Sequence, residues 1–234
     1  YGAYIRFDGI TEFGIMEFHI DGWRYLNAGQ QWAQGNIFWM EGGVYYRPAI
    51  HLLHAGAIKL FGSNDYSIKI VNSVLDLLTI GLLFWGARLL TGNRWAALLT
   101  AALYALLAPV LELVWSEYPH APSAFLVSLS FCLFLASYLE KRGPALGRLL
   151  LAVSGLCVGL CANMHLELAS LGPAYIGCIA LLEFAKRPNR HGVLQFILSS
   201  AVFTLAFFVP CLLIMTLVGV EEAFTGFLQE VARG

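Results

Sequence analysis

The chain is organised around a short amphipathic stretch, HIDGWRYLNAGQQWAQG, at residues 19–35. At helical spacing Tyr25, Ala28 and Trp32 form an apolar stripe, and polar side chains occupy the opposite side. About fourteen residues are too few to cross a bilayer. An amphipathic helix of this length lies along a membrane surface, so the stretch predicts a surface helix.

The two ends of this helix carry boundary residues. Asp21 stands where an N-cap stands, and Gly35 stands where a helix stops. The helix would hold the Asp21 carboxylate at the boundary between water and lipid. Two interpretations follow: Asp21 only caps the helix, or it supplies a carboxylate for chemistry.

A second short helix is expected after a loop at residues 36–47 that is rich in glycine and aromatic residues. Pro48 is well placed to begin this helix, and Gly62 to end it. It contains His51 and is again too short to cross a bilayer. We interpret it as a second interfacial helix.

The composition identifies a polytopic α-helical membrane protein. Of the 234 residues, 59% are hydrophobic and 12% are charged, and the mean hydropathy is +0.69. A soluble domain carries about twice that charged fraction. Six segments are long enough to span a bilayer, at residues 66–90, 95–115, 121–140, 147–164, 168–185 and 193–219.

Two features inside these spans call for a packing partner. Asp76, with Asn72 one turn before it, is costly in lipid and must face protein or water, for which we expect a structural role. Gly155 and Gly159, spaced four apart, suit close contact with another helix.

The charges at the ends of the spans divide into two groups. One group holds eight of the fourteen basic residues: Arg88, Arg94, Lys141, Arg142, Arg148, Lys186, Arg187 and Arg190. Short loops rich in Lys and Arg favour the cytoplasm. We therefore expect a multi-pass protein of the plasma (inner) membrane, with both short helices and the turns at 115–121 and 163–167 on the extracytoplasmic face.

This topology gathers seven polar residues on one membrane surface: Asp21, Arg47, His51, Glu117, His120, His165 and Glu167. Carboxylates beside Arg and His suit general-base chemistry on a phosphate-linked substrate, because the base needs a lone pair and the cations neutralise phosphate oxygens. Plainer readings stay open. Glu117 and His120 would then be ordinary loop residues, and His165 and Glu167 would pair with each other or meet lipid headgroups. A metal site built from His19, Asp21, His120 or His165 is a further alternative, but no pair of these residues has a diagnostic spacing, so the sequence does not support it.

Several motifs resemble one known family. RFDGI at residues 6–10 and DGWRY at residues 21–25 resemble the first outer loop of the polyprenyl-phosphate-sugar glycosyltransferases of the C-type (GT-C) fold. That group includes the protein O-mannosyltransferases and the bacterial lipid A aminoarabinose transferases. Arg47-Pro48 and Leu60–Gly62 resemble the start and end of the family's second interfacial helix. The resemblance covers residues 5–140 well and the remainder only in helix pattern.

The resemblance implies roles for individual residues. It places catalysis on Asp21 and on Glu117 or His120, and binding of the donor phosphate on Arg47 and Lys69. His51, His165 and Glu167 would line the site. The sequence departs from the family at Gly22, which replaces the usual acid, and at His165, where many relatives have Arg; both changes leave the donor and metal use open.

The resemblance implies a membrane transferase that moves a sugar from a polyprenyl-phosphate donor to a glycan, lipid or protein acceptor in the cell envelope. We expect no nucleic-acid partner. The lipid-linked sugar is the expected donor substrate, and a divalent metal stays open without support from the sequence. The alternative is a non-catalytic membrane subunit that packs in a larger complex. The predicted units are an outer-face loop at 1–65, a transmembrane bundle at 66–220, and the start of an outer-face amphipathic segment at 221–234. Together they would form a partial, N-terminal module.

Overall fold

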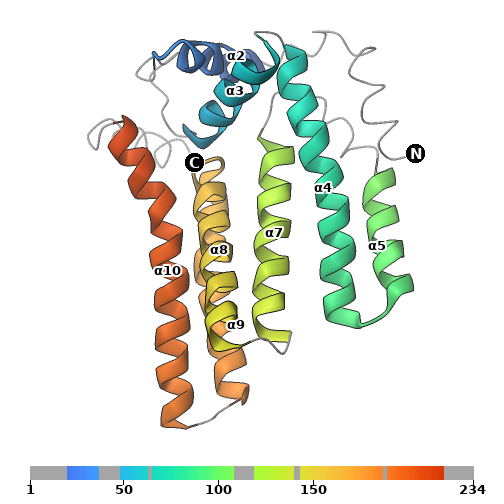
Figure 1. Ribbon diagram of the computed structural model, residues 1–234, viewed down its shortest axis with the longest axis vertical. Helices are drawn as coiled ribbons and strands as arrows, with labels where there is room; N and C mark the ends of the chain where they lie inside the picture. The colour runs from blue at the N-terminus through green and yellow to red at the C-terminus, as the bar shows by residue number, and fades with distance from the viewer. Residues whose placement is uncertain are drawn as a thin grey trace.

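The computed structural model describes residues 20–36, 48–62, 65–107, 119–139, 143–186 and 189–218. Within these ranges every regular element is a helix. Two short helices, α2 (Ile20–Ala33) and α3 (Pro48–Phe61), lie across one end of a bundle of longer helices (Figure 1). Residues 221–234 and the first nineteen residues lie outside the described ranges.

The two ends of α2 differ in how well the sequence predicted them. Gly35 ends the helix as expected: its φ is 92°, and its N–H donates to the Trp32 carbonyl at 3.0 Å. The N–H of Asn36 donates to the Gln31 carbonyl at 3.0 Å, which completes a Schellman motif. The N-cap prediction for Asp21 is wrong, because the helical backbone extends to Ile20 and makes Asp21 the second helical residue.

The apolar stripe of α2 faces α3 rather than lipid. Tyr25, Ala28 and Trp32 are each at most 6% exposed, and α2 packs along α3. Gly29 permits this close approach, since a Cβ there would lie 2.6 Å from the Cβ of His54. The two short helices therefore form one packed unit, to which we refer as the α2–α3 cap.

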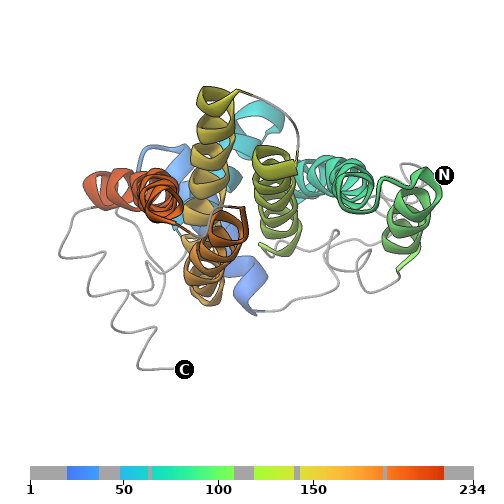
Figure 2. The ribbon, with the colours of Figure 1, turned by 90° about the horizontal axis from the view of Figure 1, so that it is seen from below.

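The remaining elements form the bundle and its connecting turn. They are α4 (Asp65–Thr91), α5 (Arg94–Leu106), α7 (His120–Leu139), α8 (Pro144–Ala162), the short 3-10 helix η1 (Leu166–Ser170), α9 (Leu171–Lys186) and α10 (Arg190–Val218). Seen from the end opposite the cap, α8, α9 and α10 cluster together, α7 lies centrally, and α4 and α5 extend in a row beyond it (Figure 2). Within the described ranges, five segments are long and apolar enough to cross a membrane: residues 66–91, 120–139, 144–162, 166–186 and 190–217.

One of the six predicted spans is wrong in its described part. We expected a helix over 95–115, but α5 ends at Leu106 after thirteen residues, and Leu107 is extended with φ −67° and ψ 110°. Pro109 explains the early end, because proline disfavours helical backbone at the residue before it and cannot donate a backbone hydrogen bond. Residues 108–118 lie outside the described ranges.

Basic residues of the predicted cytoplasmic group lie at the end of the bundle away from the α2–α3 cap. Arg88 lies in the last turn of α4 and Arg94 begins α5, while Lys186 ends α9 and Arg190 begins α10. All of these helix ends lie at the lower end in Figure 1. The separation of charge that was predicted from the sequence is therefore a separation between the two ends of one bundle.

The cap and the bundle are joined by a small apolar cluster. Trp32 of α2 and Ala49 of α3 pack with Met164, which follows α8, and with Ile214 of α10. The first turn of α3 is thus held beside the turn that follows α8. This contact places the start of α3 close to the residues at 164 and 165.

Candidate active site

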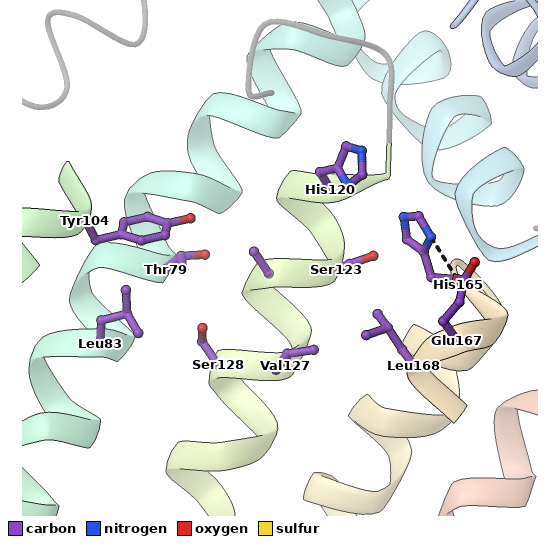
Figure 3. A pocket seen from close by; sticks show the side chains of 11 residues that line it. Thr79, Leu83, Tyr104, His120, Ser123, Val127, Ser128, His165, Glu167 and Leu168 are labelled. Carbon is purple, nitrogen blue, oxygen red and sulfur yellow. Dashed lines mark ion pairs between the residues drawn. The ribbon is translucent and has the colours of Figure 1, made fainter. Parts of the chain in front are cut away.

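An open cavity of about 470 Å³ lies beside the beginning of α7. Residues of α4 and α5 form one side of it, and residues at and around η1 form the other (Figure 3). Its lining consists of Thr79, Leu83, Tyr104, His120, Ser123, Ala124, Val127, Ser128, His165, Glu167 and Leu168. The cavity therefore mixes hydroxyl, imidazole and carboxylate groups with aliphatic side chains.

Two histidines stack at the rim of this cavity. His120 is the first residue of α7, and His165 lies in the turn between α8 and η1. The N–H of His165 donates to the Cys161 carbonyl at 2.8 Å, and the extended backbone at His165, with φ −141°, turns the chain into η1. The two rings stack with centroids 5.3 Å apart and an angle of 27° between their planes.

Glu167 completes this edge of the cavity. Its Oε2 lies 3.5 Å from Nδ1 of His165, and its side chain is 75% exposed, whereas His165 is 16% exposed. The pairing of these two residues, one of the readings open from the sequence, is therefore present. Three of the predicted site residues, His120, His165 and Glu167, meet at one place (Figure 3).

The opposite wall is built on a buried polar face of α4. Lys69, Asn72, Ser73, Asp76 and Thr79 follow helical spacing along this face, and each is at most 3% exposed. The Tyr104 hydroxyl of α5 donates to Oδ1 of Asp76 at 2.7 Å. Asp76 thus faces a neighbouring helix, as the sequence required of an acid within a span.

The other predicted site residues lie elsewhere or outside the described ranges. Lys69 is buried within α4, and His51 is 8% exposed in the α2–α3 cap, with its ring 5.9 Å from Tyr25 and 5.6 Å from Trp32 between centroids. Asp21 is described by its backbone in α2. Arg47 and Glu117 lie outside the described ranges.

A comparison with known protein families matches residues 47–214 to the dolichyl-phosphate-mannose-protein mannosyltransferase family. This match spans more than half of the chain. The chain belongs to this family. The comparison with curated proteins and the comparison with solved structures each give no match.

Membership of the mannosyltransferase family gives the chain its general class. It is a multi-pass membrane glycosyltransferase of the kind that uses polyprenyl-phosphate sugar donors. The matched region begins at Arg47 and contains every residue that lines the cavity, whereas Asp21 precedes it. The resemblance that was noted in the sequence is confirmed at the level of the family.

Sequence reasoning missed the wall formed by Thr79 and Tyr104. One signal for this wall was available in the sequence, because an acid at position 76 within a span needs a polar partner. The sequence does not show which helix supplies that partner. In the part of the chain that the structure describes, no three His, Cys, Asp or Glu side chains come together as a metal-binding group.

Proposed function

We propose that this protein transfers a sugar from a polyprenyl-phosphate donor to an acceptor hydroxyl on the extracytoplasmic side of the plasma membrane. The reaction takes place at the end of the bundle covered by the α2–α3 cap. The acceptor is a glycan, a lipid or a protein of the cell envelope.

In this proposal the acceptor oxygen attacks the anomeric carbon of the donor sugar. The bond between that carbon and the phosphate oxygen breaks, polyprenyl phosphate leaves, and the acceptor proton passes to the carboxylate of Asp21. Arg47 balances the charge on the phosphate. A carboxylate accepts this proton only as the transition state develops, since its pKa is far below that of a hydroxyl, and positioning therefore carries much of the rate.

One observation supports this site above the others. His120 lies far from His165 and Glu167 in the sequence, yet these three side chains converge on one cavity within the region matched to the mannosyltransferase family. They lie at the end of the bundle that carries the α2–α3 cap, where Ala49 of α3 packs beside Met164. In this proposal His120 or Glu117 orients the acceptor, and His165 and Glu167 line the approach.

The packing of two glycines weakens the alternative that the chain is a non-catalytic subunit. In that alternative Gly155 and Gly159, whose spacing suits close contact with another helix, would contact a helix of another subunit. Both glycines face α10 of the same chain: a Cβ on Gly155 would meet the Phe203 carbonyl, and one on Gly159 the Phe207 carbonyl. These small residues are therefore used for packing inside the bundle.

The test is sugar transfer by the full-length protein in proteoliposomes that contain radiolabelled polyprenyl-phosphate mannose and extracted envelope acceptors. Asp21→Asn should lower turnover about 10²–10⁴-fold, the usual contribution of a general base. Thermal stability in detergent should stay near that of the parent, because losing one acidic side chain in the first turn of a helix costs only about 0.3–1 kcal/mol.

The matched control is Asp65→Asn. Asp65 is the first residue of α4, at the same end of the bundle, and has no role in the proposal. Transfer by this variant should equal that of the parent. Near-parental transfer by Asp21→Asn would remove the carboxylate from the mechanism, and a parent that transfers to no acceptor would favour the non-catalytic subunit.

A further inference from the structure

We propose that the cavity between α4, α5, α7 and η1 is the pocket that binds the transferred sugar, and that Tyr104, oriented by Asp76, determines its specificity. This inference rests on the proposed function, because it names where the sugar of the donor lies. It assigns a binding role to α5 and to the buried polar face of α4.

The size of the cavity suits a small polar ligand. Its volume of about 470 Å³ lies within the range of small-molecule pockets, about 300–1,000 Å³. A sugar and its linkage fit this space, and a long polyprenyl chain would extend beyond it. The aliphatic groups of Leu83, Val127 and Leu168 contribute the apolar surface that such pockets combine with a few polar groups.

The hydroxyl groups on the α4–α5 wall are set up as hydrogen-bond acceptors. Tyr104 donates its proton to Asp76 at 2.7 Å, and Thr79 donates its proton to the Leu75 carbonyl at 2.9 Å. A hydroxyl that has donated its single proton acts toward any further ligand as an acceptor. Both hydroxyls point toward α7 (Figure 3). This wall therefore selects a ligand that presents O–H donors, which is the chemistry of a sugar.

Asp76 gives the tyrosine its fixed direction. The carboxylate is 1% exposed, and it accepts from a residue 28 positions away on a different helix. The Tyr104 hydroxyl donates to Oδ1 of Asp76, so its proton points toward α4 and away from the ligand. Asp76 is thus a positioning residue, whereas Tyr104 lines the cavity itself.

The experiment compares two lipids that differ only in the sugar. Equilibrium binding of polyprenyl-phosphate mannose and of bare polyprenyl phosphate is measured with the full-length protein in nanodiscs. Tyr104→Phe removes one oxygen and should weaken binding of the mannose-linked lipid about five- to tenfold, the usual contribution of one hydrogen bond. Binding of bare polyprenyl phosphate should not change.

The chain offers a matched control in Tyr138→Phe. The Tyr138 hydroxyl donates to Oε1 of Glu183 at 3.2 Å, so it forms the same kind of pair, but it lies in the last turn of α7, at the end of the bundle away from the cap. This variant should bind both lipids as the parent does.

A double variant guards against loss of the fold. Tyr104→Phe leaves the Asp76 carboxylate without its tyrosine donor, whereas Tyr104→Phe with Asp76→Leu removes donor and acceptor together, which proteins tolerate better. In Asp76→Leu alone the Tyr104 hydroxyl loses its fixed direction. Asp76→Leu should therefore weaken binding of the mannose-linked lipid and leave binding of bare polyprenyl phosphate unchanged. The double variant should bind the mannose-linked lipid no more weakly than Tyr104→Phe does.

The outcomes separate the two proposals. Equal weakening of both lipids by Tyr104→Phe would overturn the pocket assignment, and so would a parent that binds the two lipids equally well. A parent that binds neither lipid would overturn the proposed function itself. If the double variant lost as much binding free energy for the mannose-linked lipid as Tyr104→Phe and Asp76→Leu together, the positioning role of Asp76 would be refuted.

Discussion

Lowering the pH below 6.5 should loosen the α2–α3 cap through His54. This residue of α3 is 1% exposed, and its Nδ1 lies 3.3 Å from the Tyr25 carbonyl. A carbonyl only accepts, so Nδ1 carries the proton and Nε2 is unprotonated. Among the described residues Nε2 has no hydrogen-bond partner. Burial lowers the pKa of His54 from 6.5 to about 4, and the hydrogen bond to Tyr25 offsets part of that effect.

The direction of the effect follows from the two protonation states. Above pH 6.5 His54 is neutral in both the folded and the unfolded protein, and it adds no pH dependence. Between pH 6.5 and about 4 the unfolded state binds a proton that the folded state does not, so stability is lost as the pH falls. The full difference corresponds to about 3 kcal/mol, and about 2.5 kcal/mol of it is lost by pH 4.5.

Hydrogen–deuterium exchange of the α2 backbone amides measures this loss, after correction for the intrinsic pH dependence of exchange. His54→Asn is the reference, because its side-chain amide can still donate to Tyr25 but does not titrate. Relative to this variant, protection of α2 in the parent should fall roughly 50- to 100-fold between pH 7.5 and pH 4.5. The same pH dependence in both proteins would refute the reasoning.

Two further predictions concern the bundle. An impermeant maleimide should label a cysteine placed at Gly42 in intact cells but not one placed at Gly143, because the basic loops favour the cytoplasm; the reverse pattern would invert the topology. Gly159→Leu should lower the free energy of unfolding in detergent by about 1–3 kcal/mol or more, since its side chain would meet the α10 backbone at Phe207. Gly177→Leu on α9 is the control, because a Cβ there meets nothing within 4 Å, and equal losses in both would contradict the packing argument.

The helices were predictable because their signals are local. Pro48 and Gly62 mark the ends of α3, and the spacing of Tyr25, Ala28 and Trp32 identifies the buried face of α2. The partner of that face was not predictable. An apolar stripe fits lipid and protein equally well, and the burial of this stripe together with the close approach of Gly29 to His54 shows that α3 covers it.

The candidate site was predictable in kind but not in composition. Charge sidedness alone grouped His120, His165 and Glu167 at one membrane surface, and these three do meet. Tyr104 was missed because its contact joins two helices, and no periodicity within one helix reports such a contact. The predicted span over 95–115 also obscured it, because Tyr104 would then lie in the middle of a helix instead of near the end of α5.

The early end of α5 connects the fold to the proposed chemistry. If the helix continued past Leu107, Tyr104 would lie in the middle of a membrane span. Because α5 ends at Leu106, Tyr104 lies three residues before the extended C-cap residue Leu107. Asp76 lies on the long helix α4, which extends in both directions beyond this point (Figure 1). The hydrogen bond between them fixes the end of a short helix to the middle of a long one, and the cavity wall takes its shape there. Burying an acid within a span is costly. The hydrogen bond from Tyr104 offsets part of this cost. The same bond positions the Tyr104 side chain in the proposed pocket, in addition to the packing of α5.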